Sequence, residues 1–240
     1  MDVQEATTCR LPDLKERHLP ENCRETINTI LKETYGYEQF RNLEIYDDLS
    51  KGKEKLCISQ GQLIENVILE VEKAWKGETQ VDNILLTAPT GSGKSLLFQL
   101  PAIYLGKEYN LLTIVVSPLK ALIVDQVESL QELGYTRVAY ASSDLSPEQK
   151  MEVYRQVREG EIDLFYLSPE LLLSYDIKHF VGERRIGLVV VDEAHTVTTW
   201  GKEFRVDYWF LGRYLTALKQ TLGYNFPLFA LRSEERRVGK

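Results

Sequence analysis

The sequence predicts an α/β fold: a parallel β-sheet flanked by helices, preceded by a short helical N-terminal extension. From residue 83 onward, apolar runs of strand length alternate with stretches of helical length and pattern, as in a parallel sheet with crossover helices. Most of these runs are continuously apolar, which is typical of strands buried on both faces. With 240 residues, 43% of them hydrophobic, the chain can bury a large core without disulfide or metal support.

Two helices are expected in the N-terminal part, at 22–35 and at 62–75. In both, apolar residues recur every three or four positions, as on the buried face of a helix. Gly36 stands where the first helix would end, and Lys76-Gly77 ends the second. Residues 42–61 are mixed and charged, and we expect an exposed loop at Lys51-Gly52-Lys53.

The rest of the chain divides into strands and helices in turn, without an internal repeat or a low-complexity linker. The expected strands are 83–88, 112–117, 136–141, 162–167, 187–191 and 226–231. The expected helices are 94–105, 119–133, 147–158 and 207–222.

Composition limits the function classes. The net charge is −7, so any contact with nucleic acid has to come from a local patch. The three cysteines form no Cys-x-x-Cys pair, which favours a reducing compartment and speaks against a zinc site. No apolar run approaches the roughly 18 residues of a membrane span. We therefore expect a cytoplasmic protein, associated with the nucleoid if it is bacterial.

The stretch from Thr87 to Ser95, here called the phosphate loop, follows an apolar run and leads into a helical pattern. A strand, a Gly-rich turn and a helix start form the context in which backbone N–H groups cradle phosphates. Lys94 would reach the β- and γ-phosphates, and the Ser95 hydroxyl would bind Mg²⁺. The expected nucleotide-binding residues are Thr90, Gly91, Ser92, Gly93, Lys94 and Ser95. Ala88 replaces the usual first glycine, and an ordinary Gly-rich turn is the alternative.

A pair of carboxylates, Asp192 and Glu193, follows the apolar run that ends at Val191. Ligands of open α/β sheets bind at the carboxyl ends of the strands, so this pair should face the phosphate loop. Asp192 would hold Mg²⁺, mostly through water, while Glu193 would orient and deprotonate an attacking water. The alternative is a solvated acidic turn.

The phosphate loop together with Asp192-Glu193-Ala194-His195 resembles the first motor lobe of superfamily 2 helicases. Four further stretches, spread over about residues 28–231, are similar to RecQ-like DNA helicases. The resemblance implies a RecA-like lobe that uses ATP and Mg²⁺, with catalytic Lys94, Asp192 and Glu193. It also implies an ATP-dependent DNA helicase that acts on single-stranded and forked DNA, with 3′–5′ polarity.

The first stretch, residues 31–41, is similar to the adenine-binding motif 0 of that family. By this resemblance Tyr37 and Arg41 sandwich the adenine, and a glutamine reads its edge. About eighteen extra residues separate Arg41 from Gln62, the best match for the glutamine, so Gln60 is kept as an alternative. Tyr37 could instead be an aromatic packed between helices.

Two stretches resemble elements that contact the DNA backbone in the family. Ser117 and Lys120 lie in a strand-to-helix turn like motif Ia, which offers a hydroxyl, a charge and N–H groups to phosphates. Ser168, in Ser168-Pro169-Glu170, matches an element of the DNA groove. Both turns could also be ordinary Ser-Pro helix starts.

The fourth stretch, Trp200-Gly201-Lys202-Glu203-Phe204-Arg205, resembles the aromatic-rich loop that links DNA binding to ATP hydrolysis in RecQ-like enzymes. Trp200 and Phe204 can stack bases, and Arg205 can add phosphate or cation–π contact. His195 would take part in the coupling. The alternatives are two aromatics that anchor a helix on the core and a buried histidine.

We divide the chain into residues 1–76, the extension with the adenine motif; 77–231, the RecA-like lobe; and 232–240. The last segment is similar to a translated sequencing-library adapter, and we interpret it as an appended, non-native tail; a second lobe with an arginine finger would then be missing. Without the tail's four basic and two acidic residues the net charge is −9. The rival functions are an RNA helicase, a duplex translocase, and a nucleotide-dependent scaffold without motor activity.

Overall fold

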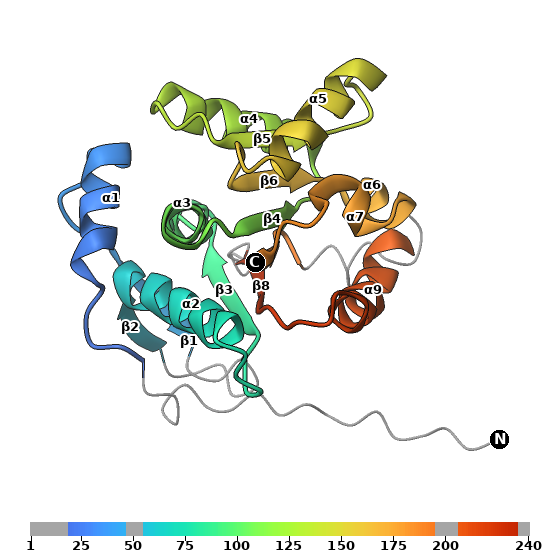
Figure 1. The fold of residues 1–240 in the computed structure, drawn as a ribbon. Coiled ribbons are helices and arrows are strands. Elements are labelled where there is room, and N and C mark those ends of the chain that lie inside the picture. Colours follow the sequence, from blue (N-terminus) through green and yellow to red (C-terminus); the bar gives the residue numbers. More distant parts are fainter. Residues whose placement is uncertain (1–18, 47–54, 195–205, 235–240) are drawn as a thin grey trace, which may run out of the picture.

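A six-stranded parallel sheet forms the centre of the molecule in the computed structural model, which describes residues 19–46, 55–194 and 206–234 (Figure 1). The strand order is β3-β8-β7-β4-β6-β5. The strands are β3 (Ile84–Pro89), β4 (Leu112–Val116), β5 (Val138–Ala141), β6 (Leu164–Leu167), β7 (Ile186–Val191) and β8 (Leu228–Glu234). Every residue of β4, β6 and β7 is buried, as their continuous apolar runs predict.

Helices cover both faces of the sheet, and each face has its own apolar core. One face carries α1 (Glu25–Tyr35), α2 (Gln60–Trp75), α3 (Leu96–Tyr109) and α4 (Lys120–Glu132). The other carries α5 (Pro147–Arg158), α6 (Pro169–Ser174), α7 (Ile177–Val181) and α9 (Val206–Leu222). The expected α/β architecture is confirmed. Two short helices, α6 and α7, were not expected, and each begins at a polar residue whose side chain accepts a backbone N–H.

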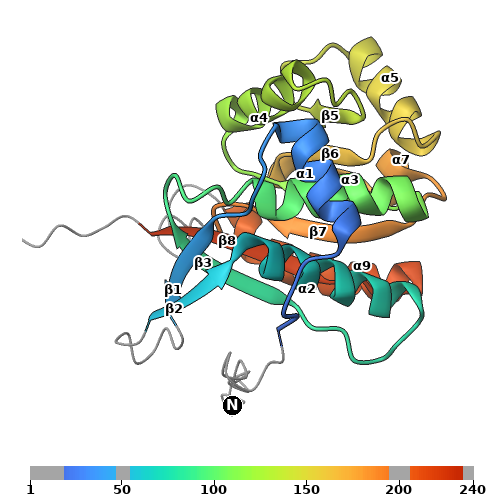
Figure 2. The ribbon, with the colours of Figure 1, turned by 90° about the vertical axis from the view of Figure 1, so that its left-hand side faces the viewer.

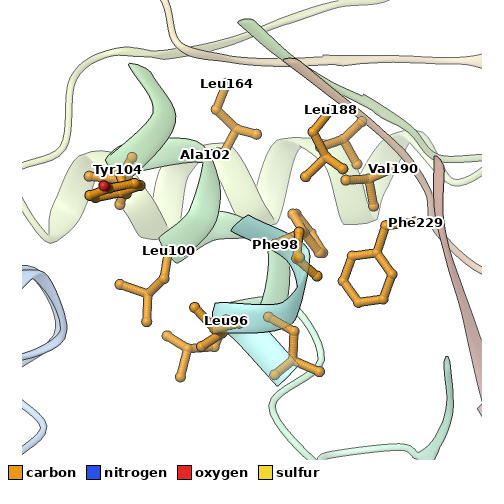
Figure 3. Close-up of a cluster of buried hydrophobic side chains, with 14 of the residues drawn as sticks. Leu96, Phe98, Leu100, Ala102, Tyr104, Leu164, Leu188, Val190 and Phe229 are labelled. Carbon is orange, nitrogen blue, oxygen red and sulfur yellow. The ribbon is translucent and has the colours of Figure 1, made fainter. Parts of the chain in front are cut away.

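The helix that follows the phosphate loop, α3, is the most deeply buried helix-forming stretch in the described part of the chain. All residues from Leu96 to Gly106 are buried, and Figure 3 shows several of their side chains in the apolar cluster. Helices α1 and α2 cover the side of α3 that faces away from the sheet (Figure 2). Phe98, for example, packs edge-on against Tyr166 of β6 with ring centroids 6.4 Å apart. The start of this helix is therefore held firmly in place at the edge of the sheet.

The N-terminal part is not purely helical, contrary to our expectation. An antiparallel hairpin of β1 (Asn42–Tyr46) and β2 (Lys55–Ser59) lies between α1 and α2. Leu43 and Ile58, which pair with each other across the two strands, are buried. Each strand has only five residues, too few for a period of two to stand out in the sequence. The hairpin leads directly into α2, which begins at Gln60, two residues earlier than expected, with Ser59 as the N-cap.

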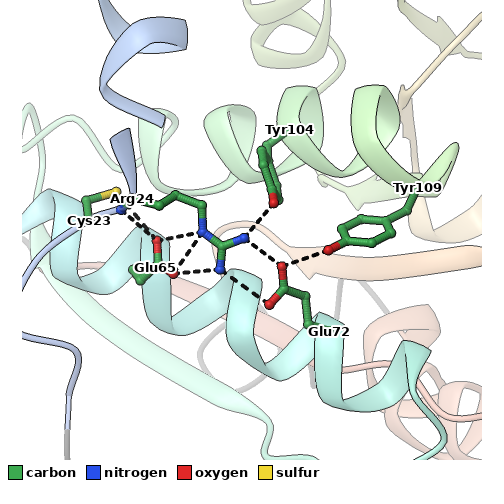
Figure 4. Close-up of polar contacts among 6 residues, drawn as sticks. All are labelled: Cys23, Arg24, Glu65, Glu72, Tyr104 and Tyr109. Atoms are coloured by element: carbon green, nitrogen blue, oxygen red, sulfur yellow. Dashed lines mark hydrogen bonds and ion pairs between the residues drawn. The ribbon is translucent and has the colours of Figure 1, made fainter. Parts of the chain in front are cut away.

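A charged cluster fastens the start of α1 to α2 and α3 (Figure 4). The Arg24 guanidinium lies 2.6 Å from a carboxylate oxygen of Glu65 and 2.6 Å from one of Glu72. It also donates to the hydroxyl of Tyr104 at 2.6 Å. Tyr109 donates to Glu72 at 3.0 Å. One arginine thus joins three helices.

The last strand, β8, is longer than the expected 226–231. Arg232, Ser233 and Glu234 continue it and pair with Thr87, Ala88 and Pro89 of β3. These residues belong to the segment that we interpret as a tail; backbone pairing does not depend on their side chains. Among the described residues, no helix combines the length and the apolar character that crossing a membrane requires.

Candidate functional site

The phosphate loop lies at the carboxyl edge of the sheet, where β3 ends and α3 begins. Gly91 and Gly93 have φ angles of +79° and +77°, a backbone region that residues with a Cβ adopt at a cost. Ser95 directly precedes α3 as its N-cap, without a side-chain cap hydrogen bond. The backbone N–H groups at this helix start and the two left-handed glycines form the concave turn that an anion needs.

Lys94 is folded back onto its own loop. Its Nζ donates to the carbonyl oxygens of Ala88 and Pro89, both at 3.2 Å. The Ser92 hydroxyl, also in the loop, is a buried atom with no hydrogen-bond partner among the described residues. A phosphate ligand fits this arrangement, because it would give both the Lys94 ammonium and the Ser92 hydroxyl an acceptor.

Asp192 and Glu193 follow β7, separated from β3 by β8 alone. The Asp192 side chain is 5% exposed, and its Oδ1 accepts a hydrogen bond from the Glu193 N–H at 2.9 Å. Burial, together with the charge of Glu193, raises the pKa of the Asp192 carboxyl to about 6, while the charge of Lys94 acts in the opposite direction. A buried carboxylate beside a second one favours a cation, so the donor set fits a divalent metal ion.

Glu193 has a φ of +49°, in the left-handed region that non-glycine residues seldom adopt. Its Oε1 accepts a hydrogen bond from Ser233 Oγ at 2.5 Å. The backbone of the acid pair is therefore strained at Glu193. Backbone strain of this kind is a common feature of functional sites.

Tyr37 and Arg41 lie in the segment between α1 and β1, and both are exposed. The Tyr37 side chain is 50% exposed, so the alternative of an aromatic packed between helices does not describe it. One of its faces stacks on Tyr35, with ring centroids 6.3 Å apart and planes at 17°. Gly36, between the two tyrosines, ends α1 with a φ of +68°, as expected from the sequence.

The hairpin closes the gap that the sequence leaves between Arg41 and the two glutamines. Because Asn42 pairs with Ser59 at the base of the hairpin, Gln60 lies next to Arg41. Gln60 N donates to Arg41 O at 2.9 Å, and Arg41 N donates to Gln60 Oε1 at 3.1 Å. The pairing of β1 with β2 therefore brings Arg41 and Gln60 side by side despite the extra residues between them.

The two candidate glutamines have different surroundings. Gln60 is buried, and its Nε2 donates to the carbonyl of Ser92 in the phosphate loop at 3.0 Å. Gln62 is half-buried; its Oε1 accepts from Ser59 N as part of the helix cap, and its Nε2 donates to Pro20 O. Gln60 thus bridges Arg41 and the phosphate loop. No signal in the sequence could have distinguished these two roles.

Ser117 and Lys120, at the end of β4 and the start of α4, differ in exposure. Ser117 is 2% exposed, and its hydroxyl is buried without a hydrogen-bond partner among the described residues. Lys120 is exposed and pairs with Asp144, at 3.0 Å, and with Ser143. The residues Ser143 and Asp144, in the turn after β5, were not candidates in the sequence analysis, since their closeness to Lys120 comes from the strand order.

Ser168, directly after β6, is the N-cap of α6, and its hydroxyl accepts from Leu171 N at 3.3 Å. Ser168 therefore serves as an ordinary helix start. It also lies, like Ser117, at the carboxyl end of its strand, and the two strands are neighbours. The remaining candidates of the aromatic-rich loop lie outside the described residues: His195, Trp200, Phe204 and Arg205.

The geometry defines a class of protein first: an α/β lobe with a phosphate loop and an acid pair at the carboxyl ends of its strands, and with the Tyr37–Gln60 segment bonded to that loop. The family model for DEAD/DEAH box helicases matches residues 65–224. The chain belongs to this family.

Within the family, the resemblance to RecQ-like enzymes is confirmed. The chain is 34% identical to the ATP-dependent DNA helicase RecQ of Synechocystis over 202 residues, which covers 83% of this chain and 35% of that protein. It is 38% identical to RecQ of Bacillus subtilis over 126 residues, covering 52% of this chain and 20% of that one. The chain thus spans about a third or less of the length of these relatives.

Solved structures support the fold. The helicase MrfA, in a crystal structure bound to DNA and AMPPNP, matches 92% of this chain and 27% of its own, with a TM-score of 0.58 and 19% identity. At that identity the similarity shows the RecA-like helicase fold alone.

Proposed function

We propose that this chain is the ATP-binding motor lobe of an ATP-dependent DNA helicase, with the 3′–5′ polarity that its RecQ relatives lead us to expect. One observation carries the proposal: the phosphate loop, the acid pair and the Tyr37–Gln60 segment meet at one edge of the sheet, where Gln60 joins two of them. ATP would lie with its adenine against the free face of Tyr37 and its phosphates in the phosphate loop.

The residues of the site divide the work. Lys94 would release the carbonyls of Ala88 and Pro89 and neutralise phosphate charge. The Ser95 hydroxyl and the Asp192 carboxylate would hold Mg²⁺, which supplies further charge neutralisation when bound. Glu193 would orient the attacking water and accept its proton.

For the adenine, Gln62 remains the proposed reader, and Gln60 supports it. Gln62 is half-buried and can exchange its cap contacts for an adenine edge at a modest cost. Gln60 is fully buried with both ends of its amide in use, so we assign it to positioning. Arg41, exposed beside it, would cover the second face of the base.

DNA would cross the same edge further along, over the ends of β4 and β6. Lys120 would exchange Asp144 for a phosphate of single-stranded DNA. Ser168 follows the neighbouring strand β6, at the N-terminus of α6. Ser117 would shape the turn rather than contact DNA by its buried side chain. In the aromatic-rich loop, Trp200 and Phe204 would stack bases and Arg205 would add phosphate or cation–π contact. A shift of this loop on DNA binding would then change the positions of His195 and Glu193.

The test is the ATPase rate of a two-lobe protein that carries this lobe, with single-stranded DNA, duplex DNA or RNA as activator. A DNA helicase responds most to single-stranded DNA. Preference for RNA or for duplex would favour the rival motors, and no response to any of them would favour a scaffold.

Variants at the DNA edge sharpen this test. Lys120→Ala should weaken DNA affinity and reduce the dependence of log K on log salt by about 1. The matched control is Lys107→Ala, an exposed lysine in the last turn of α3, at the opposite edge of the sheet. Equal effects of both substitutions would speak against a DNA contact at Lys120.

A further inference from the structure

A chain of side-chain hydrogen bonds runs through the core behind the site. The Tyr35 hydroxyl donates to Gln99 Oε1 at 2.9 Å, and Gln99 Nε2 donates to the Tyr166 hydroxyl oxygen at 3.2 Å. The Tyr166 hydroxyl in turn donates to Gln126 Oε1 at 3.0 Å. The four residues come from α1, α3, β6 and α4, so the chain joins elements that are distant in the sequence.

The two ends of this chain lie next to the two proposed binding sites. Tyr35 stacks on Tyr37, the proposed adenine platform. Gln126 belongs to α4, whose first residue is Lys120, the proposed DNA contact. In the middle, Gln99 lies in the first turn of α3, where its N–H donates to Ser95 O of the phosphate loop at 3.0 Å. The row of hydrogen bonds therefore runs from the proposed adenine site, past the phosphate loop, to the helix that carries the proposed DNA contact.

The hydrogen bonds all point in the same direction, from Tyr35 to Gln126. Burial raises the pKa of both tyrosine hydroxyls, so both keep their protons throughout the physiological range. Gln99 and Tyr166 are 5% and 1% exposed, so water cannot replace a lost partner easily. Hydrogen bonds in such a row polarise one another, and a shift of one member is felt by the next.

We propose that Gln99 and Tyr166 are positioning residues that couple nucleotide binding to the binding of single-stranded DNA. The inference rests on the proposed function, because it takes Tyr37 as the adenine platform and Lys120 as a DNA contact. A nucleotide that fixes Tyr37 and the start of α3 also fixes Gln99, and through Tyr166 it holds α4 in the matching position. By linkage, DNA bound at α4 must strengthen nucleotide binding by the same factor.

The experiment measures this factor in the 240-residue chain at low salt. The Kd of a non-hydrolysable ATP analogue with Mg²⁺ is determined with and without saturating oligothymidylate, and the Kd of the oligothymidylate with and without the analogue. In the wild type the two ratios should agree and lie in the range of about 5- to 150-fold that is typical of coupled sites. In Tyr166→Phe, which keeps the ring and loses two hydrogen bonds, both ratios should fall below twofold while each separate Kd changes less than threefold.

Two further variants distinguish coupling from stability. Tyr35→Phe breaks only the first link and should also lose the coupling, which covers the case in which Tyr166→Phe fails to fold. The matched control is Tyr135→Phe: its hydroxyl donates to Asp163 Oδ2 at 3.1 Å, just before the opposite end of β6. This control should lower the melting temperature and keep the coupling.

Full coupling in both Tyr166→Phe and Tyr35→Phe would overturn the inference, as would its equal loss in Tyr135→Phe. A wild type that binds both ligands without coupling would overturn the inference alone. A wild type that binds neither would overturn the proposed function as well.

Discussion

Gln60 and Gln62 are two residues apart, yet their side chains serve different parts of the site. At the N-terminus of α2, Gln60 points toward the phosphate loop and Arg41, whereas Gln62 completes the cap of its own helix. The close approach of Gly93 explains part of this difference: a Cβ there would lie 2.7 Å from Gln60 Nε2. The phosphate loop accepts the glutamine amide because a glycine makes room for it.

This division predicts opposite effects of two substitutions. Gln60→Ala removes the bridge, so the Kd values for ATP and GTP should rise together and the melting temperature should fall. Gln62→Ala should instead reduce the preference for ATP over GTP, because the contacts with the adenine edge are lost. Nucleotide competition with melting curves on the same preparations checks both. A selective loss of adenine preference in Gln60→Ala would exchange the two roles.

Tyr37 offers the second prediction at this scale. Its exposed ring is already stacked on one side, so Tyr37→Ala removes a prepared platform with little effect on the core. The loss should be about 1–3 kcal/mol of base stacking, a factor of about 5 to 150 in the Kd for ATP. Tyr37→Phe, the matched control, should bind ATP as the wild type does. Unchanged ATP affinity in Tyr37→Ala would remove the platform from the site.

At the scale of elements, the position of α1 determines where Tyr37, the proposed adenine platform, lies. The Arg24 cluster holds the start of this helix, and its end carries Tyr35 and Gly36. Although burial opposes it, the hydrogen bonds from Arg24 and Tyr109 lower the pKa of Glu72 below its ordinary value. A lowered pKa of an acid means that the cluster's contribution is complete above the unfolded value and is lost as the pH falls through the folded one.

Arg24→Ala should therefore lower the free energy of unfolding by about 3 kcal/mol at pH 7, because Glu65 and Glu72 lose their common cation. The deficit should shrink below about pH 4, where the carboxylates of the unfolded chain become protonated. The control is Arg155→Ala, whose carboxylate partners Glu152, Glu159 and Glu161 are all half exposed, and which should change stability by less than about 0.5 kcal/mol. Denaturant unfolding at several pH values measures both. Equal effects would mean that the cluster does not fasten α1.

The aromatic-rich loop is the element through which DNA would reach the acid pair. In a two-lobe protein that carries this lobe, Trp200→Ala should leave the DNA-free ATPase near that of the wild type and abolish its stimulation by single-stranded DNA. If Trp200 is a core residue, truncation costs about 3–5 kcal/mol, and stability, ATP binding and basal ATPase fall together. Melting curves beside both ATPase rates separate the two outcomes.

For the whole molecule, the sequence predicted the sheet well and the contacts between distant segments poorly. Buried parallel strands such as β4 and β7 are visible as continuous apolar runs, and the phosphate loop and the acid pair stand directly at the ends of two strands. The β1–β2 hairpin was missed because each strand has only five residues and because the sequence that joins them is rich in charges. The bond from Gln60 to the phosphate loop spans 32 residues, and that from Arg24 to Tyr104 spans 80. Contacts between residues so far apart leave no local pattern in the sequence, so they can be identified only once the fold is known.

The central claim is that the phosphate loop and the acid pair form one ATP-hydrolysing site, and two substitutions test it most directly. ATP binding and single-strand-stimulated turnover are measured in a two-lobe protein carrying this lobe. Lys94→Ala should lose most ATP binding and all turnover. Glu193→Gln should bind ATP like the wild type and lose nearly all turnover, because the Mg²⁺ site remains while the base is gone. Near-normal turnover in Glu193→Gln, or unchanged ATP affinity in Lys94→Ala, would contradict the account.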